Sequence, residues 1–312
     1  MTVRNFDSLL NPASVALIGA SPKAGSVGCI VAQNLRRGGF AGPIWFVNPK
    51  YRHLGEAPCF ATVAALPAAP DLAVLVTPPD TVPPLIAELG AKGTRAAVVI
   101  TAGLRGALKQ AMLEAARPHT LRVQGPNCVG LMLPRIGLNA SFSLAAPAGD
   151  IAFLSQSGAL ITGIVDWARG RSIGFSHVVS LGDMADVDFG DLLDYLAADP
   201  QARAILIYME AITHAPKFMS AARRAGRSKP VVVVKAGRSS AGAKAAQSHT
   251  GALAGSDAAY EAAFRRAGLL RVEELDDLFN AAEILSRHPR LAGDRLAILT
   301  NGGGAGVLAA DR

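Results

Sequence analysis

The feature that most constrains this chain is an alternation of short apolar runs with longer helical stretches. The runs are rich in Val and Ile, and the stretches between them are rich in Ala and Leu. Strands and helices that alternate in this order pair the strands side by side in a parallel sheet, with helices on both faces. The sequence therefore predicts an α/β protein.

The first alternating series predicts a Rossmann-type domain over residues 1–130. Residues 131–149 are richer in Pro, Gly and Asn, and we expect them to form a connector that could include a short hairpin. The expected strands of the first series lie at 15–19, 44–47, 72–77, 96–101 and 121–124, and the expected helices at 27–38, 80–92 and 107–117.

A second alternating series predicts a flavodoxin-like domain over residues 150–292. From Arg295 the sequence predicts a strand, a glycine loop and the opening of a helix. One strand and half a helix cannot bury a core, so we interpret 293–312 as the truncated start of a third α/β domain. The expected strands of the second series lie at 151–154, 177–181, 204–208, 231–235 and 270–272, and the helices at 158–170, 188–198, 215–226, 256–267 and 275–287.

Composition and charge exclude several classes of protein. Hydrophobic residues make up 50% of the chain and charged residues 18%, so a packed fold is expected. No apolar run is long enough for a membrane span and no secretion signal is present, so we expect a cytoplasmic protein without a membrane partner. The net charge is +7, but the basic residues are scattered and do not interleave with aromatics, so no nucleic-acid partner is expected.

The first glycine loop, GASPKAGSVG, follows the first expected strand and precedes a helix. Glycines let the backbone approach phosphate, and a helix N-terminus offers free N–H groups. The spacing differs from GxGxxG, and VNPK places Lys50 near the position of the acidic residue that NAD-binding proteins use. A lysine suits a ribose phosphate, such as the 3′-phosphate of coenzyme A. A tight turn without a ligand is the alternative.

Three more loops, VTPPD, ITAG and GPNCVG, follow later strands of the first series. In an open parallel sheet, ligands lie outside the carboxyl ends of the strands. We therefore expect these loops and the glycine loop to line one crevice.

The second domain opens with FLSQSGAL, which places Ser155, Gln156, Ser157 and Gly158 between a strand and a helix. Hydroxyl groups and free helix N–H groups together favour an anion site. Ordinary capping of the helix by serine is the alternative.

His249 lies in the loop segment SHTGALAGSD, among small residues that would leave it accessible as a nucleophile or acid–base group. A structural or surface role is the alternative for a lone histidine. Glu210 follows another strand, and a carboxylate that binds one ring nitrogen leaves the other free to attack phosphorus. The histidines show no metal-ligand spacing, so no metal site is predicted, and neither GxSxG nor a P-loop occurs.

Taken together, these segments resemble the NDP-forming acyl-CoA synthetases, the superfamily of succinyl-CoA synthetase. The closest likeness is to the α part of the ADP-forming acetyl-CoA synthetases, or acetate–CoA ligases. The segments that carry the resemblance span nearly the whole chain in order: VALIGASPKAGSVG, VNPK, VTPPD, GPNCVGLM, FLSQSGAL, SLGDMADVDFGDLLDYLAADP, ILIYMEAI, KAGRSSAGAKAAQSHTGALAGSD and LTNGGGAGVLAAD.

The resemblance implies roles for individual residues. His249 would be the phosphorylated histidine, Glu210 the glutamate that orients it, and Ser155 and Ser157 the hydroxyls nearest the phosphate. The residues implied around coenzyme A are Gly19, Ala20, Ser21, Gly25, Val27, Lys50, Val76, Thr77, Pro78, Asn127 and Cys128.

The resemblance also implies a reaction and partners. Acyl-CoA, phosphate and ADP would give a small carboxylic acid, CoA and ATP through an acyl phosphate and phospho-His249. ADP or ATP and Mg would bind an ATP-grasp domain or β subunit, which no segment here resembles, and an oligomer is expected. The loop TAGLRGAL also lacks an acidic residue expected near Gly106.

Two alternatives stay open. A related architecture fuses the same synthetase-like part to a GNAT lysine acetyltransferase, where it can sense CoA or acyl-CoA without ligase chemistry. The presence of His249 favours the ligase over that sensor. An NAD-dependent dehydrogenase is the other alternative, and VNPK counts against it.

Overall fold

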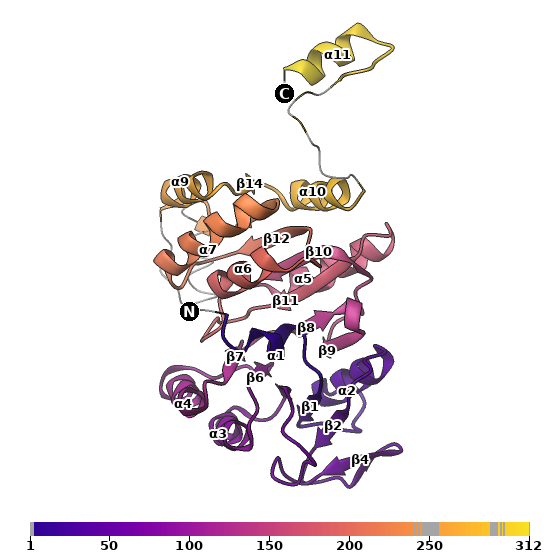
Figure 1. Cartoon of the computed structure of the whole chain (residues 1–312), viewed down its shortest axis with the longest axis vertical. Helices are drawn as coiled ribbons and strands as arrows, with labels where there is room; N and C mark the ends of the chain where they lie inside the picture. The colour runs from indigo at the N-terminus through magenta and orange to yellow at the C-terminus, as the bar shows by residue number, and fades with distance from the viewer. Residues whose placement is uncertain are drawn as a thin grey trace.

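The computed structural model describes residues 3–239, 241–242, 244, 256–287, 293, 295 and 297–311. Two seven-stranded sheets make up the two halves of the molecule, and helices cover both sheets (Figure 1). The predicted α/β fold, with a Rossmann-like half followed by a flavodoxin-like half, is confirmed.

The first sheet has the strand order β3-β4-β2-β1-β5-β6-β7, and all its pairs are parallel except β3 with β4. Its strands are β1 (Val15–Ile18), β2 (Ile44–Val47), β3 (His53–Leu54), β4 (Ala57–Phe60), β5 (Leu72–Leu75), β6 (Ala96–Val99) and β7 (Arg122–Gln124). Its helices are α1 (Phe6–Leu10), α2 (Val27–Arg37), α3 (Val82–Lys92) and α4 (Gly106–Ala116), with short 3₁₀ turns at Pro79–Thr81 and Arg117–His119.

The second sheet has the order β14-β13-β12-β10-β11-β8-β9. The region expected to be a connector contains a hairpin that joins this sheet as its antiparallel edge. Its strands are β8 (Gly130–Leu133), β9 (Leu138–Ser141), β10 (Ala148–Ser155), β11 (Phe175–Ser180), β12 (Ala204–Met209), β13 (Val231–Lys235) and β14 (Leu270–Val272). Its helices are α5 (Gly158–Arg169), α6 (Phe189–Ala198), α7 (Ala215–Ser228), α9 (Asp257–Ala267) and α10 (Leu275–Arg287).

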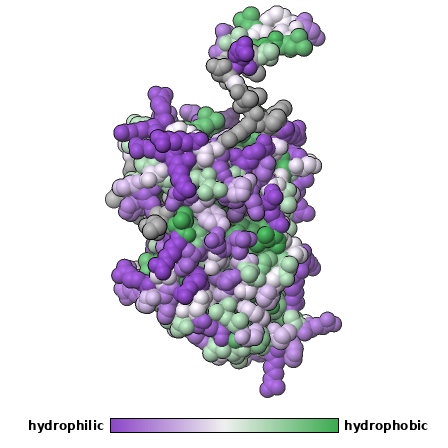
Figure 2. Space-filling view, in the orientation of Figure 1, coloured by the Kyte–Doolittle hydropathy of each residue, from purple (hydrophilic) through white to green (hydrophobic). Residues whose placement is uncertain are grey.

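The last segment differs from its prediction in one respect. The expected helix forms as α11 (Gly303–Ala310), but the described residues 297–300 form no strand. A strand needs a hydrogen-bonding neighbour, and this segment stands apart from both sheets (Figure 1). Its apolar side chains Leu299, Val307 and Leu308 are therefore exposed, and Figure 2 shows apolar colour on the projecting helix.

One continuous hydrophobic core joins the two halves. The cluster includes Leu17 of β1, Leu131 of β8, Leu154 of β10 and Phe189 of α6, all of which are buried. Separate clusters fill the far face of each sheet. Because burial of apolar surface is the main driving force of folding, the shared cluster fixes the two sheets against each other.

A set of hydrogen bonds, here called the interdomain clasp, joins residues 122–130 to residues 180–187. The buried Gln124 side chain donates from Nε2 to the carbonyl oxygens of Gly130 at 3.0 Å and Ser180 at 2.7 Å. Arg122 pairs with Asp186, with 2.9 Å between Nε and Oδ2. The clasp holds the loop after β7 against the loop after β11.

The buried His177 of β11 predicts a pH dependence of stability. Removal from water lowers its pKa to about 4; the nearby cations Lys229 and Arg135 act in the same direction, and the Asp199 carboxylate opposes them. In the unfolded chain a histidine titrates near pH ~6.5. The unfolded state therefore binds the extra proton between these values, and the free energy of unfolding should fall as the pH falls through that window.

We expect His177→Gln to flatten this dependence, because glutamine carries no titrating group. Urea unfolding at pH values from 7 to about 4.5 measures the slope, and His53→Gln, at an exposed position, serves as the control. Equal slopes for the wild type and His177→Gln would contradict the assignment.

Candidate functional site

Two adjoining cavities lie at the carboxyl ends of the first sheet. The larger, here called the outer cavity, has a volume of about 740 Å³ and belongs to the first domain. The smaller, here called the junction cavity, has a volume of about 420 Å³ and lies between the two domains. Both are lined by Val76 and Thr77, so the sites adjoin and can hold one elongated ligand.

The outer cavity gathers residues from three predicted loops. The structure brings Gly19 and Ser21 of the glycine loop together with Lys50 after β2 and Pro78 after β5. Lys50 is exposed, and its backbone N–H donates to Oδ1 of Asn48 at 2.9 Å. The cavity thus combines an exposed ammonium with a glycine loop, which suits a ligand that carries phosphate.

The glycine loop is tied closely to helix α2. Ser26 caps the helix, since its Oγ accepts from the backbone N–H of Cys29 at 3.2 Å. A Cβ atom on Gly28 would lie 2.3 Å from the carbonyl oxygen of Gly19, so only glycine allows the helix to start so close to the loop. The predicted residues Ala20 and Gly25 are in this loop but do not line either cavity.

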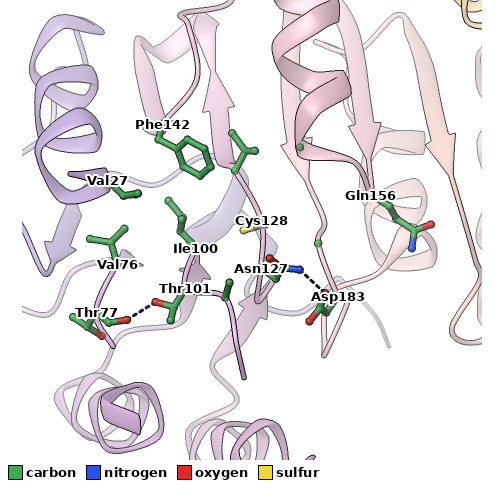
Figure 3. A pocket seen from close by; sticks show the side chains of 14 residues that line it. Val27, Val76, Thr77, Ile100, Thr101, Asn127, Cys128, Phe142, Gln156 and Asp183 are labelled. Atoms are coloured by element: carbon green, nitrogen blue, oxygen red, sulfur yellow. Dashed lines mark hydrogen bonds between the residues drawn. The ribbon is translucent and has the colours of Figure 1, made fainter. Parts of the chain in front are cut away.

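The junction cavity has an apolar side and a polar side (Figure 3). Phe142 and Val27 point into it beside Ile100, and both are 38% exposed although they are large and apolar. On the polar side, Asn127 donates from Nδ2 to Asp183 Oδ1 at 3.1 Å. Such a cavity fits a ligand with an apolar portion and a polar group that must be oriented.

Cys128 lines the junction cavity but is a structural thiol. Burial raises its pKa to about 12, and its Sγ donates to the carbonyl oxygen of Val99 at 3.4 Å. A neutral buried thiol is a poor nucleophile.

Helix α5 begins at the edge of the junction cavity, where Gly158 lines the wall. Ser155 Oγ accepts from the backbone N–H of Ser157 at 3.0 Å and donates to the Ser157 carbonyl oxygen at 2.8 Å. Ser157 Oγ caps the helix by accepting from the N–H of Leu160. The serine hydroxyls therefore do cap the helix, which was the alternative interpretation. The N-terminus of the helix also borders the cavity at Gly158, which is where an anion site would need it.

The predicted pair of Glu210 and His249 is described only in part. Glu210 follows β12, is 8% exposed and lines neither cavity. Gln156 lines the junction cavity, yet its side chain binds the backbone at Glu210 rather than facing an open anion site. His249 lies outside the described residues, so its contact with Glu210 stays a prediction.

Sequence reasoning missed several residues of the junction cavity. Ile100 and Thr101 follow β6, where the ITAG loop was a signal but no residue was assigned. Gly182 and Asp183 lie in SLGDMADV, which entered only through the resemblance. Phe142 had no signal, because nothing in its local sequence shows that it faces a cavity.

No helix in the part of the chain that the structure describes is long and apolar enough to cross a membrane. Within those same residues, no group of three His, Cys, Asp or Glu side chains could hold a metal ion.

The fold and the paired cavities define a two-domain α/β protein with ligand-sized cavities at the carboxyl ends of its first sheet. Two family models match the chain: a CoA binding domain over residues 13–134 and a succinyl-CoA ligase like flavodoxin domain over residues 148–285. The second match covers the part that contains the α5 N-terminus and Glu210.

Similar proteins narrow the class to a family. The chain is 47% identical to the ADP-forming acetate–CoA ligase I of Archaeoglobus fulgidus, over 98% of the chain and 45% of that protein. It is 41% identical to the α subunit of the ADP-forming acetate–CoA ligase I of Pyrococcus furiosus, over 98% of the chain and 69% of the subunit. A solved acetyl-coenzyme A synthetase 1 from Ca. Korarchaeum cryptofilum, in complex with phosphate and ADP, matches with a TM-score of 0.93 and 39% identity, over 98% of the chain and 68% of that structure.

The chain therefore belongs to the NDP-forming acyl-CoA synthetase family and corresponds to the α part of its ADP-forming acetate–CoA ligases. The chain spans under half the length of the Archaeoglobus ligase. The family membership confirms the resemblance and favours the ligase over the acetyltransferase-linked sensor and over the dehydrogenase.

Two glycines in helices give a matched test of the outer cavity. We expect Gly28→Ala to lower the affinity for CoA at least about tenfold, because its Cβ collides with the Gly19 carbonyl and displaces the loop. Gly163→Ala in α5 has open space around the new Cβ and should preserve CoA affinity and stability. Calorimetric titration with CoA and a thermal melt measure both effects, and equal CoA affinity of the two variants would contradict the close-approach role.

Proposed function

We propose that this chain is the CoA-binding and phosphoryl-carrying part of an ADP-forming acyl-CoA synthetase. Its reaction would convert acyl-CoA, phosphate and ADP reversibly into a carboxylic acid, CoA and ATP. The observation that carries the proposal is that the cavity lined by Lys50 and the cavity lined by Gly158 at the start of α5 share Val76 and Thr77. A ligand with phosphates at one end and a reacting thioester at the other fits this arrangement.

The outer cavity would hold the nucleotide end of CoA. Lys50 would pair with the 3′-phosphate, and the glycine loop with the α2 N-terminus would bind the diphosphate. The pantetheine arm would pass Val76 and Thr77, which line both cavities. The thioester would then lie in the junction cavity between the apolar pair Val27 and Phe142 and the polar side.

In the first step, phosphate held at the start of α5 would attack the thioester carbonyl. A C–O bond forms and the C–S bond breaks, which gives an acyl phosphate and the CoA thiolate. The helix N-terminus favours a bound anion, and the first-turn N–H groups other than that of Leu160, which Ser157 caps, would donate to its oxygens. Ser155 and Ser157 shape this turn through their local hydrogen bonds.

In the second step, a ring nitrogen of His249 would take the phosphoryl group and release the carboxylate. Glu210 would bind the other ring nitrogen and so leave the attacking nitrogen unprotonated. The phosphohistidine would transfer its phosphoryl group to ADP, which conserves the free energy of the thioester in a transferable bond.

The nucleotide would bind an ATP-grasp domain or a partner β subunit together with Mg. A relative named as an α subunit supports such a partner, as does an ADP complex in a relative of which this chain covers 68%. The acid would be small, with acetate as the first candidate, and the cytoplasm would be the site of action.

His249 provides the direct test of the proposal. We expect the wild type, incubated with ³²P-labelled phosphate and acetyl-CoA, to acquire an acid-labile label on His249, and His249→Ala to acquire none. The variant should bind CoA as the wild type does, because the outer cavity belongs to the first domain. A wild type that stays unlabelled would refute the ligase proposal.

Lys50 tests the orientation of CoA. We expect Lys50→Ala to lower the affinity for CoA about tenfold, because the charge-assisted contact with the 3′-phosphate is lost. The affinity for 3′-dephospho-CoA, which lacks that phosphate, should stay nearly unchanged. Lys109 lines neither cavity, so Lys109→Ala is the matched control. An equal loss of affinity for both ligands would contradict the contact between Lys50 and the 3′-phosphate.

A further inference from the structure

The side chain of Gln156 holds the backbone on which Glu210 stands. Its Oε1 accepts from the backbone N–H of Glu210 at 2.6 Å and from that of Ala211 at 2.9 Å. Both partners are donors, so the acceptor must be the amide oxygen and the orientation of the amide is fixed. Gln156 and Glu210 are each only 8% exposed, so water competes little for these bonds.

The position of Gln156 is itself determined by the sheet. β10 and β12 are adjacent parallel strands, with Ser155 opposite Tyr208, and the N–H of Gln156 donates to the Tyr208 carbonyl at 3.3 Å. The side chain therefore extends from the end of β10 across the end of β12. Figure 3 shows it running away from the other labelled residues of the junction cavity.

Two further hydrogen bonds hold the loop after β12 beyond Glu210. The N–H of Ile212 donates to the hydroxyl of Tyr260 at 3.4 Å, and Thr213 Oγ1 donates to Asp188 Oδ2 at 2.9 Å. Gln156 binds the Glu210 backbone directly and also lines the junction cavity.

We propose that Gln156 is a positioning residue for phosphoryl transfer, which fixes Glu210 where it orients His249 and so links the junction cavity to the phosphoryl carrier. The inference rests on the proposed function. A displacement of about 1 Å in a group that orients a nucleophile can slow a reaction about 100-fold, so two hydrogen bonds at the Glu210 backbone suffice for a large effect. This role differs from the contact with phosphate that the sequence suggested for Gln156.

The charges around Glu210 make the inference testable by pH. Lys235 is 4% exposed, and its ammonium lies 4.5 Å from the centre of the Tyr260 ring. Burial lowers the pKa of Lys235, while the carboxylates of Asp257 and Glu210 oppose this and Arg271 adds to it. Burial and the Glu210 charge likewise raise the pKa of Tyr208.

Two substitutions separate the acceptor from the charge. Gln156→Met keeps the length of the side chain but offers no acceptor for the two N–H groups. Gln156→Glu keeps an acceptor oxygen at the same place but puts a second carboxylate beside Glu210, which favours the protonated form of the pair. Gln110→Met, on exposed α4, controls for a general loss of an amide.

The experiment measures the rate of His249 labelling by ³²P-phosphate and acetyl-CoA against pH, with CoA affinity and amide hydrogen exchange of the same proteins. We expect Gln156→Met to label about 10- to 100-fold more slowly, with unchanged CoA affinity and faster exchange at the amides of 210 and 211. Gln156→Glu should recover most of the rate and protection, with the acidic limb of its pH profile moved to higher pH.

Three results would overturn the inference: labelling of Gln156→Met at the wild-type rate, a Gln156→Glu profile that coincides with that of the wild type, or unchanged protection of the two amides in Gln156→Met. If the wild type acquires no label, the proposed function is contradicted instead. The exchange measurement then still tests whether Gln156 binds the Glu210 backbone.

Discussion

The geometry of the site depends on the two hydrogen bonds that the buried side-chain amide of Gln124 donates. Its Nε2 joins the carbonyl oxygens of Gly130 and Ser180, and so ties the end of the first sheet to the second. An amide placed there without these partners would cost about 1–3 kcal/mol in lost hydrogen bonding, so the clasp forms with one register. The junction cavity exists because this clasp holds the loop after β7 against the loop at Asp183.

The location of the site follows from the arrangement of loops at the carboxyl ends of parallel strands. In both sheets the proposed site residues come within two residues of a strand end: Gly19 after β1, Thr77 after β5, Gln156 after β10 and Glu210 after β12. A parallel sheet carries all such loops at one edge, and two sheets that share a core bring their edges together. The residues proposed to bind the ligand and those proposed to carry the phosphoryl group thus follow strand ends of the two sheets.

The residues of the SQSG turn have different hydrogen-bond partners. Ser155 and Ser157 hold the turn and cap α5, whose first residue, Gly158, lines the junction cavity. Gln156, between them, binds the next strand's loop. One short segment therefore supports both the proposed anion site and the residue proposed to orient the histidine. The same segment lies within the match to the succinyl-CoA ligase like domain.

The sequence by itself determined the order of most strands and helices, because the period of the apolar residues is a local signal, and α10 was predicted over the residues where it occurs. It did not predict helix α1 or the strands β3 and β4, and several ends differ from the prediction, as for β5, which ends at Leu75 rather than at residue 77. It predicted a strand after Arg295, but the described residues 297–300 form none. Only the tertiary structure decided that Phe142 and Asp183 face one cavity, that the hairpin of β8 and β9 joins the second sheet, and that Gln156 binds the Glu210 backbone. These are contacts between residues far apart in the chain, and local patterns carry no information about which distant groups a side chain meets.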